Sequence, residues 1–153
     1  MTSVDPNGFP NHVAADELIE SAWGNAVVDN LKRVARQFAA VGGGGSSGGG
    51  IDIVTLTVPA VPIPTVCVVQ GHLRVDIASI AGTYNVNIVY GATPIGTWQT
   101  SVTGIHYCSV LGVQDVPANV APQFTLRGGG TANVTVFGDP TINRIVATST
   151  VQV

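Results

Sequence analysis

The sequence predicts a mostly β protein: an N-terminal α-helix, a glycine-rich linker and a C-terminal antiparallel β-sandwich of the jelly-roll type. Three observations predict this organisation. Apolar residues recur at helical spacing only within residues 14–41. A run of Gly and Ser, GGGGSSGGG, follows at residues 42–50. From residue 51 onward, short apolar or alternating segments are separated by turn signals rich in Pro, Gly and Asn.

These boundaries divide the 153-residue chain into an N-terminal arm and helix (1–41), a linker (42–50) and a β-sandwich domain (51–153). The first residues of the arm are rich in Pro, Gly and Asn, and they carry neither the basic start nor the apolar core of a signal peptide. A Gly/Ser stretch is flexible in isolation, so we expect residues 42–50 to act as a hinge.

The helix predicted at residues 14–41 has an apolar seam that its neighbours in the chain do not obviously cover. From Val27 onward the apolar residues are spaced 4, 3, 4 and 3 apart, which is a heptad-like pattern. Exposed apolar stripes mark interaction sites, so we expect the seam to bind copies of the chain, another protein, or both. The alternative is that the helix folds back on the β domain. The residues expected to form this oligomerisation or docking seam are Trp23, Val27, Leu31, Val34 and Phe38.

Strand signals fill the rest of the chain. Residues 84–90 alternate cleanly between apolar and polar, and residues 51–58 alternate with one slip of phase between Ile53 and Val54. Further strand candidates are residues 66–70, 72–79, 96–102, 106–113, 123–127, 133–137 and 142–153. Helical segments do not alternate with these strands, so a parallel α/β sheet is excluded. About eight or nine short strands with turn signals between them favour a sandwich, in particular a jelly roll.

Composition indicates which partners to expect. Only 10% of the residues are charged and the mean hydropathy is +0.38, which is unusual for a free soluble monomer. We therefore expect a homo-oligomer, with a trimer favoured, that buries neutral surface between its subunits. The net charge of −3 offers no basic footprint for nucleic acid. No apolar run reaches the length of a membrane span, so we expect no membrane partner either.

Residues for catalysis or metal binding are sparse. The three histidines occur without a second metal ligand at the usual spacing, and no CxxC or HExxH motif is present. Ser109, His106 and Asp115 form a hydrolase triad only on paper, because no nucleophile-elbow sequence surrounds any Ser. We therefore expect no enzymatic activity, no cofactor and no metal site.

Two further residue types have alternative interpretations. Trp98, in the segment PIGTWQ, is the best candidate for contact with a sugar ligand, and core packing is the alternative. Cys67 and Cys108 lie in apolar strand-like runs, and we expect them to be buried free thiols. A disulfide between neighbouring strands is the alternative for the cysteines.

The stretch HVAADELIESAWGNAVVDNL, and within it the pieces ELIESAWGN and VDN, resembles the N-terminal segment of small minor tail and appendage proteins of tailed bacteriophages, especially those infecting actinobacteria. The resemblance covers 20 of the 153 residues of the chain. It implies that a short helical N-terminus attaches the protein to other virion proteins while a variable β domain faces outward. It therefore implies a virion structural protein: a minor tail, fibre or capsid-decoration component. The alternative function is a module that binds host cell-surface carbohydrate.

Overall fold

The computed structural model describes residues 36–41, 45–47, 50–139 and 141–152, which belong to one compact unit. Within these residues the chain forms eight β-strands and no helix. The strands are β1 (Arg36–Val41), β2 (Gly45–Ser47), β3 (Ile51–Thr57), β4 (Thr65–Tyr90), β5 (Thr93–Thr100), β6 (Gly104–Val116), β7 (Gln123–Val136) and β8 (Arg144–Val151). The predicted all-β character of the chain from residue 51 onward is confirmed. The described residues include no helix long and apolar enough to cross a membrane.

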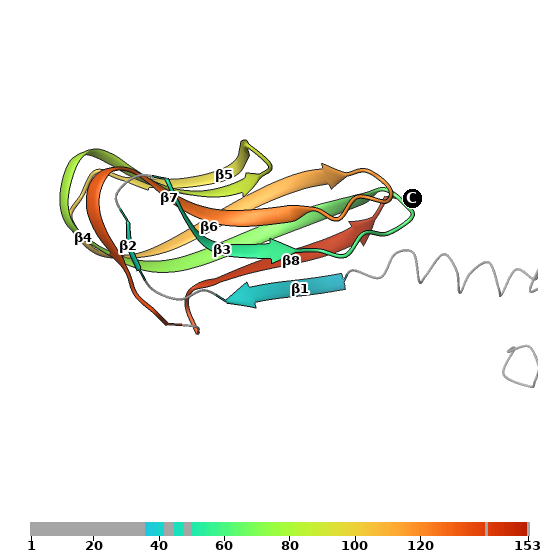
Figure 1. Ribbon diagram of the computed structural model, residues 1–153, viewed down its shortest axis with the longest axis horizontal. Helices are drawn as coiled ribbons and strands as arrows, with labels where there is room; N and C mark the ends of the chain where they lie inside the picture. Colours follow the sequence, from blue (N-terminus) through green and yellow to red (C-terminus); the bar gives the residue numbers. More distant parts are fainter. Residues whose placement is uncertain (1–35, 42–44, 48–49, 140, 153) are drawn as a thin grey trace, which may run out of the picture. The chain divides into compact units, whose positions relative to one another are not determined.

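All strand pairs are antiparallel, and they form one connected sheet built around β4. The main path of the sheet is β1-β8-β4-β7-β2, with β3 paired to β7 and with β5 and β6 paired to β4. The first part of β4, residues 65–72, lies between β6 and β8. Its last part, residues 84–90, lies between β5 and β7. Figure 1 shows how β4 curves back between these two parts.

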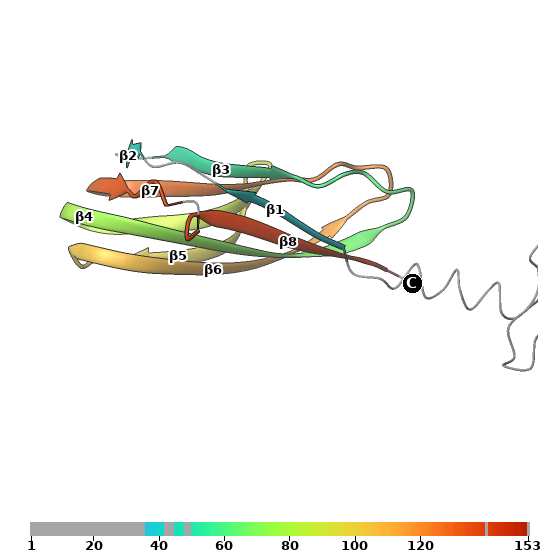
Figure 2. The same ribbon diagram turned by 90° about the horizontal axis from the view of Figure 1, so that it is seen from below.

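Because β4 curves, the two halves of the sheet face one another. Gly71 of β4 lies against Leu126 of β7, and Gly96 of β5 lies against the Leu111 and Gly112 backbone of β6. A Cβ built on Gly96 would be 2.2 Å from the Leu111 carbonyl oxygen, so the backbones of β5 and β6 approach closely there. The sheet is thus nearly barrel-shaped, and Figure 2 shows β3 and β7 on one side of it and β6 on the other.

The inner face of the sheet forms the core. Every second residue of β4 is buried from Thr65 to Ile77, which is the pattern of a strand with one face covered. The largest fully buried side chains are Tyr84, Phe124, Leu73, Ile77, Ile88 and Leu126. They come from β4 and β7, so these two strands supply much of the apolar surface that stabilises the fold.

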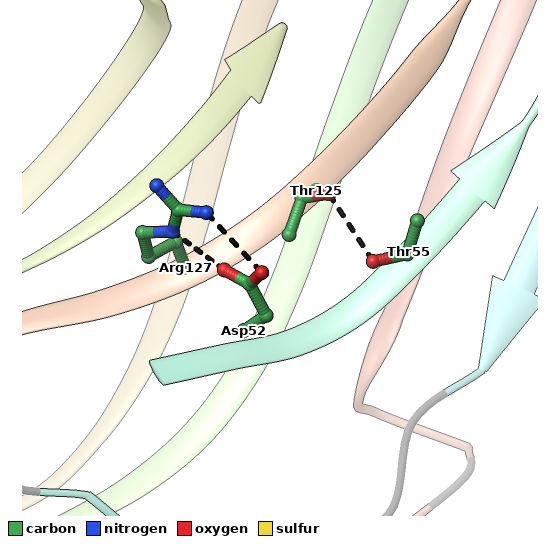
Figure 3. Close-up of polar contacts among 4 residues, drawn as sticks. All are labelled: Asp52, Thr55, Thr125 and Arg127. Carbon is green, nitrogen blue, oxygen red and sulfur yellow. Dashed lines mark hydrogen bonds and ion pairs between the residues drawn. The ribbon is translucent and has the colours of Figure 1, made fainter. Parts of the chain in front are cut away.

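The register of β3 against β7 is marked by two polar contacts on the exposed face, drawn in Figure 3. Arg127 donates to both carboxylate oxygens of Asp52, with Nε 2.5 Å from Oδ1 and a second nitrogen 3.2 Å from Oδ2. The hydroxyls of Thr55 and Thr125 lie 3.1 Å apart. The guanidinium of Arg127 lowers the pKa of Asp52 below its ordinary value. A register shift lies between Asp52 and Val54, which confirms the predicted slip of phase.

The end of the predicted helix is corrected by the structure. Residues 36–41 form strand β1, which pairs with β8 and places Phe38 opposite Ala147. Phe38 and Ala40 are half-buried against the core, so alternation rather than helical spacing describes this segment. Pairing with β8 also satisfies backbone groups that a helix would have bonded internally. The rest of the predicted helix, residues 14–35, lies outside the described residues.

The predicted Gly/Ser linker also contributes to the sheet. Residues Gly45–Ser47 form the short strand β2, which pairs with the end of β7. Glycine in a strand weakens it, and here the backbone pairing with β7 holds the segment in the sheet. The β unit therefore takes in segments of both the predicted helix and the predicted linker.

Candidate interaction surface

An apolar row runs along the outward face of β6. Ile105, Tyr107, Leu111 and Val113 are exposed at 54%, 66%, 58% and 57%. They alternate with inward residues, so all four side chains leave the sheet on the same side. Val68 of β4 lies opposite Val113 and is also exposed. Five of the eight large apolar side chains exposed in the described part of the chain thus gather on one face, as expected for an interaction surface.

The exposed ring of Tyr107 in this row lies beside the guanidinium of Arg74. The guanidinium carbon of Arg74 lies 4.1 Å from the centre of the Phe137 ring and 5.7 Å from the centre of the Tyr107 ring. Arg74 pairs with Tyr107 across β4 and β6, so the cation lies beside the exposed phenol. Cation–π contact of this kind favours a fixed orientation for both side chains.

The turn between β7 and β8 is organised by a buried amide. Asn143 is fully buried, accepts a hydrogen bond from the Arg74 amide at 3.0 Å and donates one to the Phe137 carbonyl. Asp139 accepts hydrogen bonds from the backbone and hydroxyl of Thr141, at 3.0 and 2.6 Å. These bonds lower the pKa of the Asp139 carboxyl, because they stabilise its charged form. The turn therefore positions both Arg74 and the start of β8.

A polar hollow of about 480 Å³ lies on the same outward face, over β1, β4 and β8. It is lined by Gln37, Ala39, Gln70, His72, Thr141, Arg144 and Val146. His72 lies opposite Arg144, and Gln70 lies opposite Val146. The lining offers amide, imidazole and guanidinium groups, which can bond hydroxyls or an acidic group of a ligand. Apolar row and polar hollow therefore share one face of the molecule.

The predicted seam residues fall into two groups. Trp23, Val27, Leu31 and Val34 lie outside the described residues. Phe38 lies in β1, where its side chain packs against the core of its own chain. The part of Phe38 in the oligomerisation seam stays a prediction.

Trp98 lies in β5 and is half-buried against the core. Its ring centre is 5.6 Å from that of His106, and the two ring planes are tilted by 58°. The most exposed aromatic ring on the outward face is instead that of Tyr107. Sequence reasoning missed Tyr107, because the outward and the inward residues of β6 are both largely apolar and their pattern does not distinguish the exposed set.

The groups considered for chemistry are kept apart. His106 faces the opposite side of β6 from Ser109 and Asp115, and its Nε2 lies 3.0 Å from the Val102 carbonyl oxygen. Cys67 and Cys108 are buried free thiols, as predicted. Burial raises the pKa of Cys67, and it raises that of Cys108 to about 12. Among the described residues, no three His, Cys, Asp or Glu side chains gather as metal ligands would.

Comparisons with known proteins show no family for this chain. No protein-family model matches the sequence, and no curated protein matches it. Among solved structures, the chain is similar to the tripod (BppUct-A-L) from the baseplate of bacteriophage Tuc2009, at 15% identity and a TM-score of 0.37. The match covers 99% of this chain and 80% of the other. A likeness this low supports no conclusion about fold or role.

Proposed function

We propose that this chain is a non-enzymatic structural protein of a bacteriophage virion, a minor tail, fibre or capsid-decoration component. In this proposal residues 1–34 attach it to other virion proteins, and the β unit is a jelly-roll-like knob that faces outward. The observation that carries the proposal is the exposed apolar row on β6, which an isolated soluble protein would rarely leave open. The resemblance of the N-terminal segment to phage minor tail and appendage proteins is the reason for proposing that the assembly is a virion.

The proposed oligomer is a homotrimer assembled through the N-terminal seam. Without Phe38, the residues Val27, Leu31 and Val34 keep the first 4 and 3 steps of the heptad-like pattern, and Trp23 lies four residues before Val27. Low charge over the β unit favours the same conclusion, because neutral surface is readily buried between subunits.

The test is the composition of purified particles of the virus that encodes the chain. We expect mass spectrometry to detect the full-length chain in washed particles, and a chain lacking residues 1–34 to be absent from them. The truncation ends before β1, so the β unit keeps all its strands. Absence of the full-length chain from the particles would overturn the virion role. Incorporation of the truncated chain would move attachment to the β unit.

The second candidate function is recognition of host cell-surface carbohydrate. The polar hollow favours it, since Gln70, His72 and Arg144 present donors and acceptors on the same face as the exposed ring of Tyr107. A glycan array with the full chain tests it. Binding lost on Arg144→Ala but kept on Trp98→Phe assigns the hollow, and the reverse assigns Trp98. Absence of binding by the wild-type chain contradicts this function.

A further inference from the structure

The free edge of β6 is long and regular. β6 has 13 residues, and it pairs with β4 from Gly104 to Val116 without a register shift. In the described part of the chain, no other strand pairs with β6. Alternate residues therefore direct their backbone N–H and C=O groups to an edge that no described strand pairs with, although the β5 backbone at Gly96 lies close to β6 at Leu111 and Gly112.

Other edges of the described sheet carry features that block pairing. β5 contains Pro94 and faces a register shift, while β3 carries Asp52 beside a bulge. β1 has 6 residues and β2 has 3. Prolines, charges, bulges and short lengths are the usual means of protecting a sheet edge. β6 has no proline and, from Gly104 to Gln114, no Asp, Glu, Lys or Arg.

The outward residues of β6 are arranged symmetrically about Ser109. Tyr107 and Leu111 lie two residues to either side, and Ile105 and Val113 lie four residues to either side. In an antiparallel pair of two β6 strands centred on Ser109, each Tyr107 faces Leu111 of the other copy. Each Ile105 likewise faces Val113 of the other copy. Aromatic–aliphatic and β-branched pairs of this kind stabilise neighbouring strands.

We propose that β6 binds β6 of a second copy of this chain, antiparallel about a two-fold axis at Ser109. The two sheets then join edge to edge, and the apolar row of one copy continues into that of the other. A second copy fits this edge better than a charged partner, because the row is neutral and matches itself in the antiparallel direction. The pairing goes beyond the proposed virion role, since it requires neither a particle nor the N-terminal seam.

Site-directed cross-linking of the full-length chain tests the register. In the proposed pair two Ser109 residues face each other across the axis, with Cβ atoms about 4.5–5.5 Å apart, close to the spacing of a disulfide. We expect Ser109→Cys, treated with oxidised glutathione, to run as a covalent dimer on a non-reducing gel. The wild-type chain is the background control, because Cys67 and Cys108 are buried and we expect them to form no dimer.

Two further variants fix the geometry. Ile105→Cys and Val113→Cys are expected to give no dimer alone and a covalent dimer when mixed, because each faces the other only across the axis. In sedimentation, Leu111→Asp is expected to weaken the association at least tenfold, whereas Thr97→Asp, on the exposed face of β5, is expected to leave it unchanged.

The proposal is overturned if folded Ser109→Cys and the mixed pair both give no dimer. It is also overturned if Ile105→Cys alone dimerises as readily as Ser109→Cys, since that requires another register. Circular dichroism verifies that each variant retains its sheet. A chain that dimerises through β6 but is absent from particles overturns only the virion role. A chain present in particles without these cross-links overturns only this pairing.

Discussion

Leu126 of β7 lies directly against Gly71 of β4: a Cβ added to Gly71 would be 1.9 Å from Leu126 Cδ1. The two residues belong to strand segments that are not paired at this point, so the contact joins the two halves of the folded sheet. Leu126 is fully buried, and the absence of a side chain at Gly71 makes room for it. Close packing of the core thus depends on a residue whose side chain is a single hydrogen.

Gly71→Ala is expected to destabilise the β unit by about 1–3 kcal/mol, because the added methyl group overpacks a dense interior. The measurement is the midpoint of urea unfolding. Gly82→Ala is the matched control, since a Cβ there would meet nothing within 4 Å. Equal midpoints for Gly71→Ala and the wild type would show that Leu126 moves aside without loss.

The ion pair between Asp52 and Arg127 predicts a pH-dependent contribution to stability. Arg127 lowers the pKa of Asp52 in the folded state, so the pair contributes stability above the unfolded value of 3.8. That contribution is lost as the pH falls through the folded-state pKa. Both side chains are substantially exposed, at 38% for Arg127 and 52% for Asp52, so the effect is smaller than that of Gly71→Ala.

Asp52→Asn should therefore unfold at lower urea than the wild type at neutral pH, and the two should converge in acid. Thr55→Ala removes the nearby uncharged contact with Thr125, so its effect on the midpoint should not change with pH. A difference between Asp52→Asn and the wild type that persists unchanged in acid would exclude the ion pair as its cause.

Asn143 is expected to be the most sensitive polar residue of the turn between β7 and β8. Asn143→Ala leaves the part-buried Arg74 amide and Phe137 carbonyl without their partner, at up to about 1–3 kcal/mol for each group. Hydrogen exchange of the Arg74 amide should accelerate together with the loss of stability. Thr141→Ala, at an exposed position of the same turn, should produce a much smaller change. Unchanged exchange at Arg74 in Asn143→Ala would contradict this assignment.

Local pattern predicted much of the β unit. Alternation located the strand at residues 84–90, where Tyr84, Val86 and Ile88 are buried on one face. The slip of phase after Ile53 appears as a bulge, because an extra residue in a strand shifts the side-chain period by one. These features depend on neighbouring residues in the chain, so the sequence alone contains them.

Features set by distant contacts were not predictable in the same way. Gly71 separates the strand candidates 66–70 and 72–79, yet it lies within the 26-residue strand β4, where it is paired on both sides and leaves room for Leu126. The local pattern around Phe38 is compatible with a helical seam, and only the pairing of β1 with the distant strand β8 shows that the residue lies in a strand. The exposed row of β6 could not be predicted from the sequence either, because Cys108 and Val110 make the inward face of the strand apolar too.

The position of Phe38 in β1 allows two roles to be tested separately: packing against the core of the β unit and oligomerisation through the predicted N-terminal seam. Phe38→Ala is expected to lower the free energy of unfolding of the β unit by about 1–3 kcal/mol, because the half-buried ring packs against its core. Leu31→Asp combined with Val34→Asp should leave that free energy unchanged, since neither residue belongs to a described strand. The double substitution should instead reduce the mass of the oligomer in sedimentation.

The two measurements together decide how far the seam extends. If the Phe38→Ala variant keeps the oligomer mass of the wild type but has a lower free energy of unfolding, Phe38 belongs to the β unit alone. If Phe38→Ala lowers the mass of the oligomer but not the free energy of unfolding, Phe38 belongs to the seam, because removal of a core contact destabilises the fold. If Leu31→Asp with Val34→Asp keeps the wild-type mass, oligomerisation does not use residues 1–34 and must depend on the β unit.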